Sequence, residues 1–286
     1  MKILEKIFSV KNEYRDSKKY KIVTILGIKL KKQVETQLNI DILHKELERL
    51  MQVIERDMHC SYVHQQVFPK YKGVNKGKTV VLCGAGPSLN NYKPMENAIH
   101  VSLNRAFYFD KVKFDYLFIQ DYKGVYPILK DFGKYENPKG CIKFVGTQND
   151  FINEEIPVSK LDFECERFIT DNHRWMFNGN FHHFTKDLET QPLGNFGSIV
   201  FPAMQFVLYT QPKKIYIVGC DSAPTGHFSG EELESNKRAL NDNTYSKLIK
   251  QWKEFKEFSD FHYPDIEIIS VNPVGLKGIF KDMYTE

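Results

Sequence analysis

Lys78-Thr79-Val80-Val81-Leu82-Cys83-Gly84-Ala85-Gly86-Pro87-Ser88-Leu89 is the stretch that decides the fold of this 286-residue chain. Its apolar run, Thr79–Cys83, predicts a buried strand of a parallel sheet. Gly84 and Gly86 lack a Cβ, so the backbone can turn sharply there and approach a ligand closely. Ser88 suits the N-cap of a following helix. The loop is therefore expected to offer free N–H groups and a helix N-terminus to a phosphate, and the alternative is a turn without a ligand.

Strand and helix patterns alternate beyond this stretch. The expected strands are Thr79–Cys83, Ile99–Leu103, Tyr116–Ile119, Ile142–Val145, Lys214–Val218 and Ile266–Val271. Helical patterns follow Ser88 and cover Gly124–Phe132, Ser198–Tyr209 and Tyr245–Phe258. This alternation is typical of a Rossmann-like α/β fold, a mostly parallel sheet with helices on both faces and its ligand at the carboxyl ends of the strands. Residues 150–190 break the pattern and are expected to form a lid or an acceptor-binding insertion.

Two smaller parts are expected before the main domain, which covers residues 78–286. Residues 1–35 form a basic appendage with a short helical pattern and then a β-hairpin pattern over Tyr20–Leu30, closed at Gly27. Residues 36–70 form an amphipathic helical segment, whose apolar stripe packs either on the main domain or on a second copy of the chain. Pro69–Gly77 has the composition of a linker.

Charge is distributed unevenly along the chain. Met1–Lys32 contains ten basic and three acidic residues, a balance of +7, whereas the whole chain carries +4, which leaves −3 for the rest. The basic head either contacts an anionic membrane or forms a solvated surface. It lacks interleaved stacking motifs and the rest of the chain is net acidic, so no nucleic acid is expected as a partner.

The five cysteines are scattered without a Cys-x-x-Cys pair, which favours a reducing compartment over a disulfide or zinc framework. The N-terminal residues lack the apolar core of a signal peptide, and the longest uncharged run is interrupted by proline and glycine. A cytoplasmic location is therefore expected, with peripheral contact at the inner face of the membrane as an option.

Polar residues follow the expected strands. Asn104 can bind a base or sugar edge or satisfy its own backbone, and Arg105 can pair with a phosphate or carboxylate. Asp121 and Asp221 can each bind a ribose hydroxyl or cap a helix. The turn Gly194-Asn195-Phe196-Gly197-Ser198 precedes an uncharged helix and forms a second candidate anion cradle.

Histidine supplies the best candidate for a general base. His227 follows the expected fifth strand, and its ordinary pKa suits proton transfer near neutral pH. The competing residues are His173, His182 and His183. No Asp-x-Asp motif occurs and no histidines have helical ligand spacing, so no metal site and no cofactor are expected.

Three stretches of the chain are informative through their order and spacing. They are the strand with Gly84-Ala85-Gly86-Pro87-Ser88-Leu89, the segment Ser102-Leu103-Asn104-Arg105-Ala106-Phe107-Tyr108-Phe109, and the Gly197-Ser198 helix leading to Lys214-Ile215-Tyr216-Ile217-Val218-Gly219-Cys220-Asp221. This order resembles bacterial sialyltransferases of glycosyltransferase family 42, whose fold is a GT-A variant, and the related 6-hydroxymethylpterin diphosphokinase MptE-like domains. The resemblance covers about Lys78 to Met283.

Both ends of the chain carry further resemblances, which point away from pterin chemistry. The head, Lys6–Glu13 through Ile25–Leu30, resembles a segment at the start of many bacterial lipopolysaccharide and capsule glycosyltransferases. The tail, Asn272–Phe280, is similar to the end of proteins from the same kind of gene cluster.

The resemblance implies a pocket for a cytidine monophosphate (CMP) donor, with Asp121 as a polar nucleotide contact and Ser198 near the phosphate. The expected donor-binding residues are Gly84, Ala85, Gly86, Pro87, Ser88, Leu89, Asn104, Arg105, Asp121, Gly197, Ser198 and Gly219. The family's general base is a histidine before the penultimate helix, where this chain has Asn241-Asp242-Asn243-Thr244. His227 or Asp221 is therefore expected to take that role.

The sequence thus predicts a metal-independent glycosyltransferase that moves sialic acid or a related acidic sugar from a CMP donor onto a lipopolysaccharide, lipooligosaccharide or capsule precursor. Its expected partners are the nucleotide-sugar donor, a glycan acceptor and, as an option, a second copy of itself. The alternatives are an ATP-dependent diphosphokinase and a non-catalytic module that binds a nucleotide or glycan.

Overall fold

The computed structural model describes residues 8–15, 18–25, 28–33, 40–120, 122–148, 161–171, 184–230 and 242–285. Contacts between residues divide the chain into two compact units, Met1–Ile54 and Glu55–Glu286. Among the described residues, no helix combines the length and apolar character needed to span a membrane.

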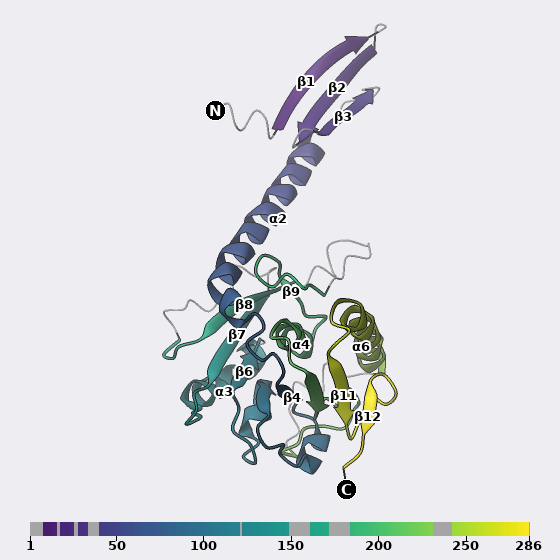
Figure 1. Cartoon of the computed structure of the whole chain (residues 1–286). Coiled ribbons are helices and arrows are strands. Elements are labelled where there is room, and N and C mark those ends of the chain that lie inside the picture. The colour runs from purple at the N-terminus through teal and green to yellow at the C-terminus, as the bar shows by residue number, and fades with distance from the viewer. Residues whose placement is uncertain are drawn as a thin grey trace. The chain divides into compact units, whose positions relative to one another are not determined.

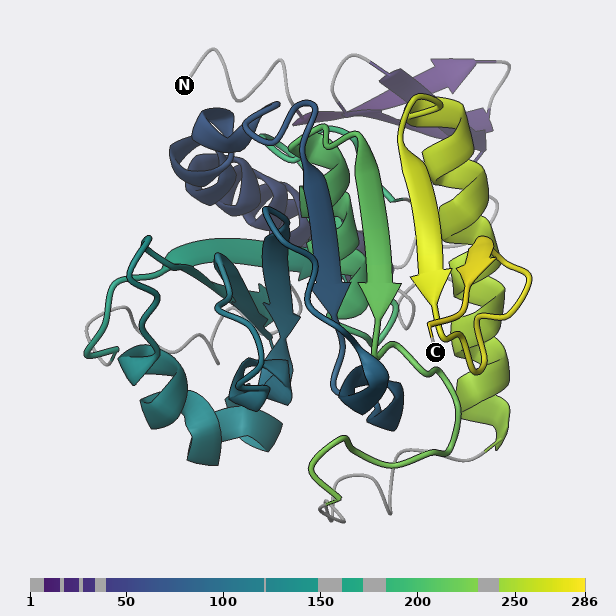
Figure 2. The ribbon, with the colours of Figure 1, turned by 60° about the horizontal axis from the view of Figure 1, so that its bottom comes forward.

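A nine-stranded sheet organises the second unit (Figure 1). Its order is β12 (Lys281–Met283), β11 (Glu267–Val271), β10 (Lys214–Val218), β4 (Thr79–Cys83), β5 (Ile99–Leu103), β6 (Tyr116–Ile119), β7 (Ile142–Gln148), β8 (Glu166–Asp171) and β9 (Leu193–Gly194). All neighbouring strands are parallel, and Figure 2 shows the arrowheads of β4, β10 and β11 pointing the same way. The expected Rossmann-like α/β fold is confirmed.

Helices cover both faces of this sheet because alternate strand residues point to opposite sides. Val80 and Leu82 belong to a core shared with α4 (Val200–Tyr209) and α6 (Asp242–His262). The core on the other face joins α3 (Tyr122–Lys134) to the short 3-10 helices η2 (Pro87–Asn91) and η3 (Asn104–Tyr108). All ten residues of α4 are buried, which accounts for its uncharged sequence.

Three strands of this sheet escape sequence prediction. β8 lies inside the region expected to be an irregular insertion, and β9 and β12 contain two and three residues. Such short or charged strands carry too few alternating positions to show a period of two. The insertion therefore contributes a strand to the parallel sheet, and its residues 150–160 and 172–183 lie outside the described part.

The segment Pro69–Gly77 is packed against the sheet domain, so its prediction as a linker is wrong. It begins with the 3-10 helix η1 (Pro69–Tyr71). The buried Tyr71 hydroxyl donates to Glu166 Oε1 at 3.0 Å, and Asn75 Nδ2 donates to Thr210 Oγ1 at 3.2 Å. Composition alone does not reveal these contacts, because the partners are distant in sequence.

The helix before this segment, α2 (Ile40–Val67), carries the buried His64 in its last turn. The N–H of the buried Ile169, in β8, donates to His64 Nε2 at 2.8 Å. Burial lowers the pKa of His64 to about 4, so the ring stays neutral and keeps this lone pair available near neutral pH.

The first unit contains a three-stranded antiparallel sheet of β1 (Phe8–Arg15), β2 (Lys18–Ile25) and β3 (Ile28–Gln33). The expected hairpin is confirmed by the pairing of Ile25 with Ile28, although its turn residue Gly27 lies outside the described residues. The helical pattern expected before it is wrong over Phe8–Arg15, which pairs with β2 along its full length.

Candidate active site

The order of the sheet reverses between β4 and β10. From β4 the chain adds β5 to β9 on one side, and it returns through α4 to place β10 on the other side of β4. Ligands of such sheets bind at the carboxyl ends of the two strands where the order reverses. Gly84 and Gly219 follow these ends, and a Cβ on Gly84 would lie 2.5 Å from the Gly219 oxygen. Glycine therefore lets the two loops meet.

An internal carboxylate occupies the position where a bound anion was predicted. Gly86 N–H donates to the Gly219 oxygen at 2.7 Å. Ser88 N–H donates to Asp221 Oδ2 at 3.1 Å, and the Ser88 hydroxyl donates to Asp221 Oδ1. The expectation of free N–H groups is therefore wrong at Gly86 and Ser88, because β10 and its loop already accept from them.

The element after the glycine loop also differs from the expected helix. Residues Pro87–Asn91 form a 3-10 helix, drawn as the dark blue coil that follows β4 (Figure 2). It is preceded by Gly86 and has no side-chain cap. Ser88 lies inside this 3-10 helix rather than at its N-cap. The side chain of Leu89, in the same helix, is fully buried. One turn of 3-10 helix aligns few peptide dipoles, so the argument from a helix N-terminus does not apply here.

Asp221 holds the two loops together. It is 5% exposed, and Thr225 Oγ1 also donates to its Oδ2 at 3.2 Å. Three donors thus engage a carboxylate that offers about four acceptor positions. A Cβ on Gly86 would lie 2.6 Å from Asp221 Cγ, so glycine is required for this approach. The arrangement favours a positioning role for Asp221 over that of a general base.

His227 lies beside the glycine loop. Its neighbour Phe228 donates its N–H to the Ala85 oxygen at 3.0 Å and accepts from Asn90 Nδ2 at 2.8 Å. Ser229 N–H donates to His227 Nδ1 at 3.2 Å, and the Ser229 hydroxyl lies 2.8 Å from the same atom. Because a backbone N–H can only donate, Nδ1 is an acceptor and the proton of the neutral ring belongs on Nε2. In this geometry His227 is arranged as a hydrogen-bond donor through Nε2.

Two thiols flank the loops but have little nucleophilic character. Burial raises the pKa of Cys83 and raises that of Cys220 to about 12. A protonated thiol is a poor nucleophile, so covalent catalysis by either cysteine is disfavoured.

Asn104, directly after β5, has a left-handed backbone with φ of +47°. Its Oδ1 is buried and has no hydrogen-bond partner among the described residues. Phe196 and Ser222, which follow β9 and β10 at the same edge of the sheet, also have positive φ. Uncommon backbone conformations of this kind cluster at functional sites. Arg105 follows Asn104 as a half-buried residue of η3.

A buried hydroxyl joins the ends of the next strands. Thr170 Oγ1 donates to the Thr147 oxygen at 3.3 Å and accepts from Gln120 Nε2 and Asn195 Nδ2, each at 3.0 Å. Because the Thr170 hydroxyl donates its proton to the Thr147 oxygen, its Oγ1 can only accept from the two amides. Both amides must therefore direct their NH₂ groups towards Thr170 Oγ1. Asn195 Oδ1 accepts from Gly197 N–H, whereas Gln120 Oε1 has no partner among the described residues. Gln120 is 8% exposed.

Sequence reasoning missed Gln120 as a site residue. The signal was available, because it directly follows the apolar strand β6. Its partner Thr170 belongs to the undetected strand β8, so nothing in the sequence fixed the orientation of its amide.

The second expected anion cradle is also satisfied internally. Asn195 Oδ1 accepts from Gly197 N–H at 2.9 Å, and the Asn195 carbonyl accepts from Ser198 N–H at 2.8 Å. The Ser198 hydroxyl accepts from Val200 N–H at 3.4 Å at the start of α4. The helix itself is confirmed, two residues shorter than expected at its start.

Several predicted site residues fall outside the described part of the chain. They are Asp121, His173, His182 and His183. Among the residues that are described, no three His, Cys, Asp or Glu side chains gather as a metal-binding group.

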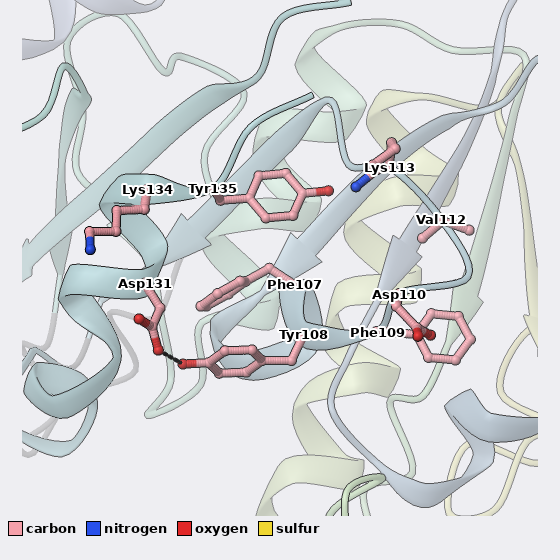
Figure 3. A pocket seen from close by; sticks show the side chains of 9 residues that line it. All are labelled: Phe107, Tyr108, Phe109, Asp110, Val112, Lys113, Asp131, Lys134 and Tyr135. Carbon is pink, nitrogen blue, oxygen red and sulfur yellow. Dashed lines mark hydrogen bonds between the residues drawn. The ribbon is translucent and has the colours of Figure 1, made fainter. Parts of the chain in front are cut away.

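A hollow of about 330 Å³ lies beside η3 (Figure 3). Tyr108, 42% exposed, stacks on Phe107 with ring centroids 4.3 Å apart. The Tyr108 hydroxyl donates to Asp131 Oδ2 at 2.6 Å, which fixes the ring. Tyr135 Oη accepts from Phe114 N–H at 2.7 Å and retains its own proton for a ligand. Lys113, Lys134 and Asp110 complete the polar lining.

Comparisons with protein-family models, curated proteins and solved structures found no match to this chain.

Proposed function

We propose that the protein is a metal-independent glycosyltransferase. It moves sialic acid or a related acidic sugar from a CMP donor onto a bacterial surface-glycan precursor at the inner face of the membrane. The observation that carries the proposal is a pair of buried amide oxygens, Asn104 Oδ1 and Gln120 Oε1, which lack partners among the described residues at the carboxyl edge of a parallel sheet. Buried acceptors of this kind are costly unless a ligand satisfies them.

The nucleoside part of the donor supplies the matching groups. A ribose offers two hydroxyl donors and cytosine an exocyclic amine, so amide oxygens at the ends of β5 and β6 suit a nucleoside better than they suit a phosphate. With Gly86 and Ser88 committed to the loop after β10, we place the nucleoside over β5 and β6 and the phosphate towards His227.

The proposed reaction breaks the bond between the anomeric carbon and a phosphate oxygen of CMP and forms one to an acceptor hydroxyl. The Nε2–H of His227 donates a hydrogen bond to the departing phosphate, and a phosphate oxygen takes the proton that the acceptor hydroxyl loses. Asp221 keeps the loops that carry His227 and the glycines in register. The absence of an Asp-x-Asp motif in the sequence agrees with a monophosphate leaving group.

The acceptor is proposed to bind in the hollow of Figure 3, whose first lining residue, Phe107, lies three residues after Asn104. The Tyr108 ring offers a face for the C–H groups of a sugar. The lysines and aspartates around it offer donors and acceptors for hydroxyl groups.

Calorimetric titration with CMP, UMP and ATP, the last with and without Mg²⁺, tests the nucleotide. We expect CMP to bind most tightly and Gln120→Met to weaken CMP binding about tenfold or more, as for one lost buried hydrogen bond. Tight binding of Mg²⁺-ATP without binding of CMP would overturn the proposal in favour of a diphosphokinase.

Slow hydrolysis of a CMP-sugar without acceptor separates an enzyme from a binding module. The transferase proposal expects hydrolysis that His227→Ala lowers by about 10²-fold or more. CMP binding without any turnover, with or without a panel of acceptor oligosaccharides, would identify a non-catalytic module.

A further inference from the structure

The sheet of the first unit has two unlike faces. Strand register places Val10, Val23 and Leu30 in one row across β1, β2 and β3, and Ile25 and Ile28 lie two residues away on the same face. Partners in antiparallel strands share a face, and alternate residues return to it. One face is therefore apolar over both rows.

The apolar side chains on the two edge strands of this face are exposed, whereas those of a hydrophobic core are covered. Val10 is 44%, Leu30 is 58% and Ile28 is 67% exposed, whereas Val23 in the central strand is 8% exposed. Exposed apolar side chains gathered on one face mark an interaction surface rather than the scatter seen on ordinary protein surfaces.

Lysines border the same face. The next row along the strands contains Asn12, Lys21 and Lys32. β1, β2 and β3 contain two, three and three basic residues against one glutamate, a balance of +7. On the opposite face Lys31 is held by Glu13 at 3.5 Å, and its ammonium lies 4.4 Å from the centre of the Tyr20 ring.

We propose that this face, defined by Val10, Ile28 and Leu30 and bordered by Lys21 and Lys32, binds the surface of an anionic phospholipid bilayer. The apolar rows enter the boundary between headgroups and acyl chains, and the lysines pair with lipid phosphates. Charge selects this occupant over a second copy, because the three strands carry a balance of +7 and two copies stacked face to face would repel each other. The proposal adds the contact surface to the membrane location within the proposed function.

Vesicle flotation of the full-length protein tests the surface without donor or acceptor, so its result is independent of transferase activity. We expect binding to vesicles of phosphatidylglycerol and phosphatidylcholine, loss of binding at about 0.5 M salt, and little binding to pure phosphatidylcholine. Ile28→Ser with Leu30→Ser should weaken binding about tenfold or more. Phe261→Ser, at an 80% exposed apolar position of the other unit, is the matched control and should bind as the unaltered protein does.

A second pair of changes keeps the test decisive if the serine variant misfolds. Lys21→Gln with Lys32→Gln leaves the apolar rows intact and should weaken binding to anionic vesicles alone. The proposal is overturned if both double variants bind as the unaltered protein does. It is equally overturned if the protein ignores vesicles and sediments as a dimer that Ile28→Ser with Leu30→Ser dissociates.

Discussion

The Asp221 carboxylate accepts hydrogen bonds from both the backbone N–H and the hydroxyl of Ser88, and so joins the loops that follow β4 and β10. Asp221→Ala would leave these buried donors and the Thr225 hydroxyl unsatisfied. We expect a loss of about 3 kcal/mol in the free energy of unfolding, measured by urea denaturation. Thr225→Val, which removes one donor, should cost about 1 kcal/mol.

Asp221→Asn distinguishes positioning from proton transfer. The amide oxygen still accepts from Ser88, but the residue no longer acts as a base near neutral pH. A positioning role predicts that hydrolysis of the donor falls by less than about tenfold, whereas loss of a general base costs about 10²- to 10⁴-fold. The larger loss, in a variant that folds normally, would restore Asp221 as the base.

Asn104 allows backbone strain to be separated from ligand recognition. Asn104→Gly keeps the left-handed conformation without steric cost, but removes the buried Oδ1. We expect stability to change by about 1 kcal/mol or less and CMP affinity to fall about tenfold or more. Asn97→Gly, at φ of +59° before β5, is the matched control and should leave CMP affinity unchanged.

Sequence reasoning located this edge of the sheet but not its internal bonding. The apolar runs at β4, β5, β6 and β10 predicted those strands residue for residue, because buried parallel strands are continuous apolar segments. The pairing of Ser88 with Asp221 was not predictable from the sequence. A carboxylate from a distant loop and a bound phosphate both accept hydrogen bonds from the same N–H groups of a glycine loop. Gln120 was missed because its amide is oriented by Thr170, whose strand is too charged to show a pattern.

Stability should depend on pH through His64. Its folded pKa of about 4 lies below the ordinary value of 6.5, so the unfolded chain takes up a proton first as the pH falls. The stabilisation is complete above pH 6.5 and is lost towards pH 4, by about 3 kcal/mol in total. Urea denaturation at several pH values measures it. His64→Gln keeps an acceptor for Ile169 N–H without titrating, so its stability should depend less on pH; equal dependence in both proteins would contradict the assignment.

Changes in the hollow beside η3 should weaken binding of the acceptor glycan and leave binding of the CMP donor unchanged. Tyr108→Ala removes the exposed ring, and we expect KM for the acceptor glycan to rise about tenfold while calorimetric CMP affinity stays constant. Tyr108→Phe keeps the ring and loses the bond to Asp131, so its KM should change less. A Tyr108→Ala enzyme with unchanged acceptor KM would place the acceptor elsewhere.

The position of β4 beside β10 also has a consequence for synthesis on the ribosome. β5 follows β4 after a short connection, but β10 begins only at Lys214. At typical rates of translation, the edge of β4 that pairs with β10 stays unpaired for on the order of ten seconds until β10 is synthesised. During that interval the nascent chain exposes an apolar strand with unpaired backbone groups, which invites aggregation. The glycine loop is therefore completed late, and the folding pathway needs protection for the same strand from which the site is built.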